Sequence, residues 1–240
     1  NDIPTSAREG LHDVAIGPNG ELFVTWLDLR ESGMELWSAQ SMDSGSTWKK
    51  NEPVYRSPDG AICTCCQPSA LYDGAGNLAV MWRNAIAGSR DMWIATRTRG
   101  ADTFSTPHKR GEGSWKIDGC PMDGGRIIGL GGGKFATVWQ RAGEVFFCPE
   151  QGPEISLGEG KQPVAVVVGD TPIFVWQKGA DLFHQYGLPS EPEKRASDAR
   201  FPVLVSLANH RGALLAYEHV TPAGPRVVVE RLEAPKVERQ

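Results

Sequence analysis

The sequence of 240 residues contains no long apolar run. The apolar segment Val164–Val168 lies between Pro163 and Gly169 and has the length of a strand, whereas a membrane-crossing helix needs about 18 or more such residues. An apolar spacing of three or four residues is not sustained over any useful length, so amphipathic helices are not predicted. We therefore expect no membrane span and little helix.

An excess of positive charge is also missing. Lys and Arg together number 25 against 29 Asp and Glu, which gives a formal net charge of −4. Proteins that bind nucleic acids generally present a basic patch, so we expect no nucleic-acid partner. The charged fraction of 22% and the hydrophobic fraction of 40% are typical of a globular domain.

Glycine, proline and tryptophan are plentiful, with 28, 17 and 8 residues. This composition favours short strands joined by many turns. One pattern recurs, in which a turn residue precedes a short apolar run that ends in an aromatic residue; its copies are 20–26, 76–82, 133–139, 170–176 and 211–217. The closing aromatic residues are roughly 37 to 57 residues apart, the range in which β-propeller blades repeat.

The flanks of this pattern repeat as well. An earlier strand is predicted to begin at His12, Pro68, the region 120–125, Pro163 and Pro202. A third strand follows each copy, and in the first two repeats a fourth element is predicted to end at Trp48 and Phe104. Residues 188–196 are predicted to form a connection between blades.

The repeat predicts an all-β fold, a β-propeller of four-stranded blades. Five blades are visible, and a sixth is possible if a blade is missing or is completed by the termini. Residues 1–240 would then form a single domain. An irregular β-sandwich or solenoid is the alternative fold.

A local motif lies after the third strand of the first repeat. The residues Ser41, Asp43, Gly45, Thr47 and Trp48 match the pattern Ser-x-Asp-x-Gly-x-Thr-Trp at every defined position. Asp43 can accept backbone N–H groups in a tight turn, Gly45 supplies a permissive backbone, and Trp48 can pack between blade strands. The corresponding stretch of the next repeat, 97–104, keeps only its last two positions.

With this motif and its repeats, the chain resembles the sialidase-like Asp-box (BNR-repeat) β-propeller family. The resemblance covers most of residues 11–140. It is closest to bacterial members without an established function that carry Cys-x-Cys-Cys and a later Cys-Pro-Met-Asp. In that family the Asp box lies opposite the catalytic face, so the motif indicates the fold and is not itself a site.

The resemblance to sialidases implies a set of candidate site residues. Those enzymes hold the sialic acid carboxylate with three arginines, and a guanidinium can bind a carboxylate through two hydrogen bonds. The matching ligand-binding candidates are Arg30, Arg83, Arg141 and Asn84. The catalytic candidates are Tyr217 and Glu218 as the nucleophile pair and Asp28 or Asp13 as the acid. The chain departs from the enzymes in having only Ile3-Pro4, without the preceding arginine, and five visible blades instead of six.

Four cysteines fall in corresponding loops of two successive repeats. The Cys63-Thr64-Cys65-Cys66 run precedes one first strand, and Cys120 precedes the next, with His12 on the repeat before. The soft ligands Cys65, Cys66, Cys120 and His12 can bind copper(I) or zinc. Alternatively, disulfides among Cys63, Cys65, Cys66 and Cys120 connect adjacent blades, as in exported proteins. Disulfides are favoured over a metal, and Cys148 is predicted to be a buried apolar residue.

These observations predict a periplasmic or secreted, sialidase-like propeller that binds an anionic or glycan ligand on a cationic, cysteine-bearing face. Catalysis is not established by the sequence, and the balance leans against it. Three alternatives stay open. They are an exo-sialidase-type glycoside hydrolase, a copper- or zinc-binding protein, and a structural propeller subunit that binds protein partners in a larger complex.

Overall fold

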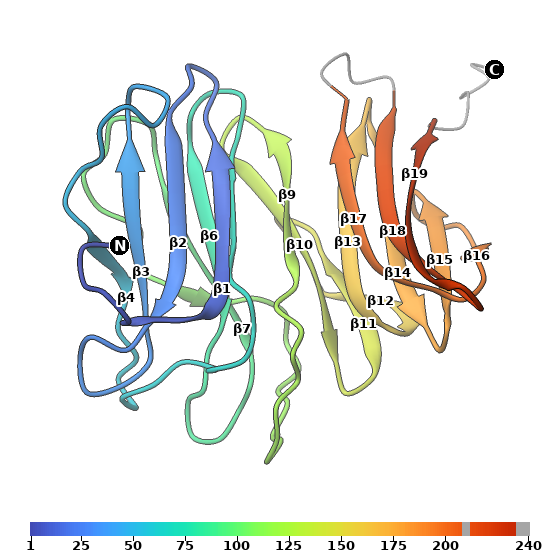
Figure 1. Cartoon of the computed structure of the whole chain (residues 1–240), viewed down its shortest axis with the longest axis horizontal. Helices are drawn as coiled ribbons and strands as arrows, with labels where there is room; N and C mark the ends of the chain where they lie inside the picture. Colours follow the sequence, from blue (N-terminus) through green and yellow to red (C-terminus); the bar gives the residue numbers. More distant parts are fainter. Residues whose placement is uncertain (208–211, 234–240) are drawn as a thin grey trace. The chain divides into compact units, whose positions relative to one another are not determined.

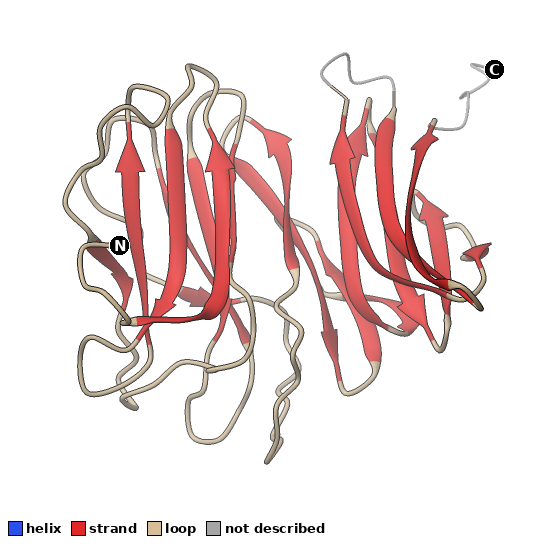
Figure 2. Cartoon of the chain, in the orientation of Figure 1, coloured by secondary structure: helices blue, strands red, loops and turns tan. Residues whose placement is uncertain are grey.

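The computed structural model describes residues 1–207 and 212–233, and its regular elements are all β-strands (Figure 2). No helix of the described residues is long and apolar enough to cross a membrane. The prediction of an all-β chain is therefore confirmed.

The strands described form five antiparallel sheets that follow one another along the chain (Figure 1). The first contains β1 (Ala7–Ile16), β2 (Leu22–Asp28), β3 (Glu35–Ser41) and β4 (Glu52–Tyr55), and the second β5 (Ser69–Tyr72), β6 (Leu78–Arg83), β7 (Met92–Arg97) and β8 (His108–Lys109). The third contains β9 (Arg126–Gly131), β10 (Lys134–Arg141), β11 (Glu144–Cys148) and β12 (Ile155–Glu159). The fourth contains β13 (Lys161–Val168), β14 (Thr171–Lys178), β15 (Asp181–Tyr186) and β16 (Glu193–Ala196), and the fifth β17 (Ala199–Ser206), β18 (Ala213–Thr221) and β19 (Gly224–Leu232).

Each predicted repeat corresponds to one sheet, and its strands pair in sequence order. The repeated apolar run is the second strand of its sheet, and the aromatic residues Trp82, Trp139 and Trp176 are almost inaccessible there. Every residue of β6 is buried. A strand with neighbours on both faces carries a continuous apolar run, which explains why this strand gave the strongest repeat signal.

The fourth strands differ from the prediction. Trp48 and Phe104 lie in loops, and the strands begin later, at Glu52 in β4 and at His108 in β8. Asp43 closes the loop that contains Trp48 by accepting hydrogen bonds from the Thr47 N–H and hydroxyl at 2.8 and 2.6 Å. The chain therefore completes a turn before it pairs with β3.

The segment 188–196 also differs from the prediction of a connection between blades. Its last four residues form β16, the fourth strand of the fourth sheet. In the ladder, Ala196 lies opposite Leu182 and Glu193 opposite His184. Backbone pairing with β15 determines this strand, and its polar side chains gave no alternating pattern.

The chain divides into two compact units, with the boundary passing through the third sheet. The first unit contains residues 1–137 and 148–154, and the second contains residues 138–147 and 155–240. In the first unit, Phe23, Leu36 and Trp82 belong to a core cluster shared by the first two sheets. In the second unit, Val175 and Leu215 belong to a cluster shared by the last two sheets. The single-domain organisation stays a prediction.

Candidate functional site

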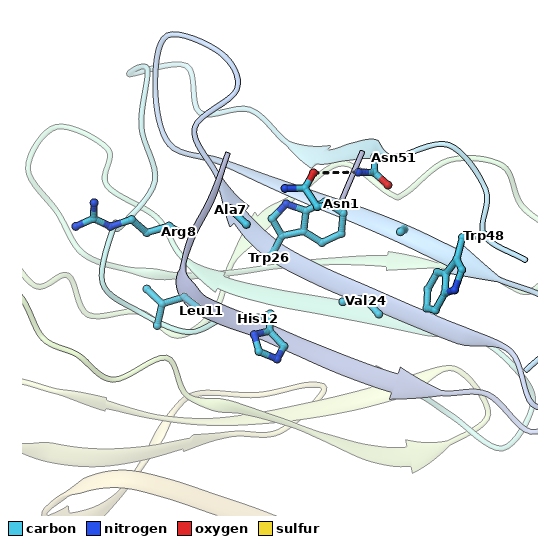
Figure 3. Close-up of a pocket in the computed structure, with 10 residues that line it drawn as sticks. Asn1, Ala7, Arg8, Leu11, His12, Val24, Trp26, Trp48 and Asn51 are labelled. Atoms are coloured by element: carbon cyan, nitrogen blue, oxygen red, sulfur yellow. Dashed lines mark hydrogen bonds between the residues drawn. The ribbon is translucent and has the colours of Figure 1, made fainter. Parts of the chain in front are cut away.

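A pocket of ≈390 Å³ opens on the first sheet (Figure 3). Val24 and Trp26 lie two residues apart on β2, so their side chains point to the same face. Ladder pairing places His12 of β1 opposite Trp26, and Ala39 of β3 opposite Val24. The remaining lining comes from the start of the chain, from β1 and from the loop before β4: Asn1, Ala7, Arg8, Leu11, Trp48 and Asn51.

The pocket combines aromatic surface with amide groups. Trp26 is buried in the sheet, whereas Trp48 is 46% exposed. The Asn51 Nδ2 group donates to Asn1 Oδ1 at 3.3 Å and to Asp2 Oδ1 at 2.7 Å. The predicted packing of Trp48 between blade strands is thus not what the structure shows, because this ring lines the pocket.

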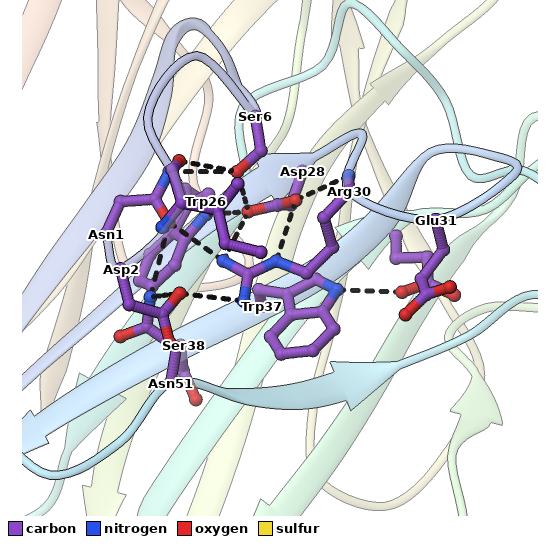
Figure 4. Close-up of polar contacts among 12 residues, drawn as sticks. Asn1, Asp2, Ser6, Trp26, Asp28, Arg30, Glu31, Trp37, Ser38 and Asn51 are labelled. Carbon is purple, nitrogen blue, oxygen red and sulfur yellow. Dashed lines mark hydrogen bonds and ion pairs between the residues drawn. The ribbon is translucent and has the colours of Figure 1, made fainter.

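A network of polar side chains adjoins the pocket (Figure 4). Asp28 is fully buried at the end of β2 and accepts hydrogen bonds from the Trp26 indole at 2.6 Å and from the Ser6 hydroxyl at 2.9 Å. It also accepts from the Arg30 backbone N–H at 2.8 Å and from its Nε and Nη2 at 3.0 Å each. Burial alone would raise the pKa of Asp28, but the hydrogen bonds from Arg30, Trp26 and Ser6 outweigh it and lower that pKa.

Arg30 connects this network to the start of the chain. Its Nη1 donates to Asp2 Oδ1 at 2.9 Å and its Nη2 to Asn1 Oδ1 at 2.8 Å. The guanidinium lies 3.8 Å from the centre of the Trp37 ring, and the side chain is only 6% exposed. Arg30 therefore holds residues 1–2 against the first sheet, and with them the amide edge of the pocket.

The other predicted ligand-binding residues lie elsewhere. Arg83 is buried, with Nε donating to the Asp123 carbonyl at 3.1 Å and Nη1 to the Arg90 carbonyl at 2.8 Å. Asn84 is also buried, and its Nδ2 donates to the Tyr55 hydroxyl at 2.8 Å. The burial of Arg30 and Arg83 is at odds with an exposed cationic face built on them.

The predicted cysteine cluster forms in the first unit. Cys65 and Cys120 are joined by a disulfide, and the Cys63 sulfur lies 3.2 Å from that of Cys66 and 3.8 Å from that of Cys65. Cys63 and Cys66 are buried free thiols. The structure contains one bond of the predicted set, and the C-x-x-C spacing of Cys63 and Cys66 is the signal that sequence reasoning missed.

Gly124 explains how the two cysteine loops come together. A Cβ at this position would lie 1.7 Å from the Gln67 carbonyl oxygen, so only glycine allows this approach of the two backbones. The Cys63 N–H donates to the Arg83 carbonyl at 3.0 Å and holds the first loop against β6. His12, which was predicted as a metal ligand here, lines the pocket of the first sheet instead.

Solved structures of several proteins resemble the chain at low sequence identity, among them the following three. Zg3597, a family 117 glycoside hydrolase from Zobellia galactanivorans, is 14% identical over 98% of this chain and 86% of its own, with a TM-score of 0.54. The GH93 α-L-arabinofuranosidase of Fusarium graminearum in complex with arabinobiose is 11% identical, over 91% of this chain and 74% of its own, with a TM-score of 0.56. The leech intramolecular trans-sialidase in complex with 2,7-anhydro-Neu5Ac is 12% identical, over 84% of this chain and 36% of its own, with a TM-score of 0.51.

The fold is a β-propeller. Its five sheets are the blades, as predicted. Neither a protein-family model nor a curated protein matches the sequence. The likeness concerns the fold alone, so membership of the Asp-box family stays a prediction.

The candidate acid groups, Asp28 and Asp13, both lie in the first blade and are hydrogen-bonded within the chain. Asp28 has a lowered pKa, whereas an acid catalyst needs a raised one. Asp13 accepts the Ala70 N–H at 2.9 Å and thereby links the first blade to β5 of the second. Both carboxylates thus act as hydrogen-bond acceptors within the structure.

The predicted site residues of the second unit, Tyr217, Glu218 and Arg141, also contact other residues of the chain. Tyr217 packs against the core cluster of the last two blades. Burial and the nearby Glu230 raise the pKa of Tyr217, and they outweigh the opposite effect of Arg195. Glu218 is paired with Arg200. Arg141 of the third blade lies with its guanidinium 3.9 Å from the Phe146 ring centre. A raised pKa disfavours the phenolate that a tyrosine nucleophile requires.

Proposed function

We propose that this propeller binds a glycan in the pocket of its first blade. The observation that carries the proposal is the combination of Trp48 and Trp26 with the amides of Asn1 and Asn51 in one pocket. A sugar ring offers apolar C–H faces to an aromatic surface, and its hydroxyls can donate to the amide oxygens of the two asparagines, whose Nδ2 groups already donate to Ser6, Asn1 and Asp2. The volume of ≈390 Å³ falls within the range of roughly 300–1,000 Å³ of small-molecule sites.

The lining favours binding over hydrolysis. Glycoside hydrolysis generally requires a pair of carboxyl groups beside the scissile bond. The described lining residues include no Asp or Glu, and the neighbouring Asp28 is saturated with hydrogen bonds. The side chain of Arg8 makes the lining cationic rather than acidic, which suits a glycan that carries a carboxylate.

The fold neighbours support a glycan as the ligand class. Two of them are a glycoside hydrolase and an arabinofuranosidase, and the third is a trans-sialidase bound to a sialic acid derivative. The ligand site proposed here differs from the predicted cationic face, because Arg30 and Arg83 are buried.

We also propose a periplasmic or secreted location. The Cys65–Cys120 disulfide supports it, because such bonds persist mainly in oxidising compartments. Fractionation of the native host, followed by detection of the chain, tests this point. Recovery of the oxidised chain from the cytoplasm would contradict the proposed location.

Titration with 3′-sialyllactose and arabinobiose tests the proposed ligand class, with calorimetry as the readout. We expect at least one of them to bind, and Trp48→Ala to weaken that binding at least tenfold, a loss of about 1.4 kcal/mol. Trp115→Ala is the matched control, because Trp115 is partly buried and lies outside the pocket. Equal affinity of Trp48→Ala and the wild type, or no binding of either sugar, would overturn the proposal.

A further inference from the structure

The four clustered sulfurs form two layers. Cys120 of the disulfide is exposed and Cys65 is half-buried. Cys63 and Cys66 lie buried next to it as free thiols, 2% and 1% exposed. The layers approach each other at Cys63, whose sulfur lies 3.8 Å from the bonded sulfur of Cys65. A free thiol and a disulfide thus lie adjacent to each other in the folded chain.

We propose that these residues form a thiol–disulfide exchange centre. In the first step the Cys63 thiolate attacks the Cys65 sulfur, a Cys63–Cys65 bond forms, and the Cys65–Cys120 bond breaks with Cys120 leaving as a thiolate. In the second step the Cys66 thiolate attacks Cys63, and Cys65 leaves. The product is a Cys63–Cys66 disulfide with two thiols at Cys65 and Cys120.

The exchange balances without an external oxidant or reductant. One disulfide is broken and one is formed, and the two thiol protons pass from Cys63 and Cys66 to Cys65 and Cys120. The second step joins residues at C-x-x-C spacing whose sulfurs are already 3.2 Å apart. It moves the disulfide to the buried layer and leaves a thiol on the exposed Cys120.

The surroundings of Cys63 favour it as the attacking group. The hydrogen bond between the Cys63 and Cys66 sulfurs lowers the pKa of Cys63 against the opposing effect of burial, and the Cys65 N–H, Arg90 and Arg83 lower it further. The Cys63 hydrogen bond, followed by burial, raises the pKa of Cys66. Because the thiolate is the nucleophile in exchange, Cys63 attacks first. Cys66 attacks in the second step, once Cys63 is bonded to Cys65.

Trypsin makes the two bonding patterns distinguishable without a reductant. Cleavage after Arg56 and Arg83, and after Lys116 and Arg126, places Cys63, Cys65 and Cys66 on one peptide and Cys120 on another. The Cys65–Cys120 bond joins the two peptides, whereas a Cys63–Cys66 bond is internal to the first. The folded, non-reduced protein is incubated with N-ethylmaleimide, digested and weighed over time.

In the wild type we expect the joined peptides to separate, with label on Cys120 and Cys65 and an internal Cys63–Cys66 bond. Cys66→Ser stops after the first step, with label on Cys120 alone, and Cys63→Ser keeps the peptides joined. Cys148→Ser behaves as the wild type, because this buried thiol of β11 lies outside the cluster. If the two peptides of the wild type stay joined throughout the incubation, with or without label on Cys63 or Cys66, the proposed exchange is wrong. This outcome is observed on the wild type alone and does not depend on whether any variant folds.

Discussion

Among single residues, Asp28 was predicted as a catalytic acid, but in the structure it accepts hydrogen bonds from Ser6, Trp26 and Arg30. The Asp28-x-Arg30 pair follows an apolar strand, which predicts an exposed loop with a carboxylate and a guanidinium available to a ligand. In the structure Asn1, Asp2 and Ser6 fold back over this loop and take up both groups. These partners lie more than 20 residues away in sequence, so no local pattern reveals them.

The Asp28–Arg30 pair leads to a prediction about stability and pH. Asp28→Asn removes the buried carboxylate of the two that Arg30 contacts and leaves only the more exposed Asp2, and we expect a loss of about 3 kcal/mol in the free energy of unfolding at pH 7. The folded-state pKa of Asp28 is lowered from 3.8, so its contribution is present above the unfolded value and is lost as the pH falls through the folded value. Urea titrations at several pH values should show the two proteins converging below pH 3.8; a constant difference would contradict this linkage.

The cysteine pairing is a second feature that the sequence predicts only in part. Four cysteines allow three pairings into two disulfides, and spacing alone does not choose among them or among single bonds. The register of the repeats correctly brought the loops of Cys63–Cys66 and Cys120 together. The selection of Cys65 depends on side-chain directions within a tight turn, which a register does not define.

At the scale of elements, side-chain alternation decides which positions stabilise the last blade. In β17 Leu204 is 8% exposed, whereas Val205 is 51% exposed, because successive residues point to opposite faces. We expect Leu204→Ala to lower the free energy of unfolding by about 2–4 kcal/mol, and Val205→Ala by about 0.5 kcal/mol or less. Similar losses for both in chemical denaturation would mean that another surface covers the Val205 face.

The strength of the sequence signal also differs from strand to strand. Second strands such as β6 are buried on both faces and were predicted from their apolar runs. The fourth strands are two to five residues long, too short for an alternating pattern, and they depend on pairing with the third strand. They were therefore placed too early in the first two blades and missed in the third and the fourth.

At the scale of the whole molecule, the two compact units raise the question of cooperativity. The Cys65–Cys120 bond spans 55 residues of the first unit, and closing a loop of this size typically adds about 2–4 kcal/mol to stability. We expect the double variant Cys65→Ser/Cys120→Ser to lose protection in hydrogen exchange at β6. In the second unit, β14 should keep its protection, because the bond does not constrain that part of the unfolded chain.

Cys148→Ser provides the comparison for this experiment, since it removes a buried thiol without removing the bond. If the units unfold independently, the double variant changes only β6. An equal loss of protection at β6 and β14 would instead mean that opening either unit opens the other. The propeller would then behave as the single cooperative domain that its repeats predict, and the boundary in the third blade would be a geometric division without a separate free energy of unfolding.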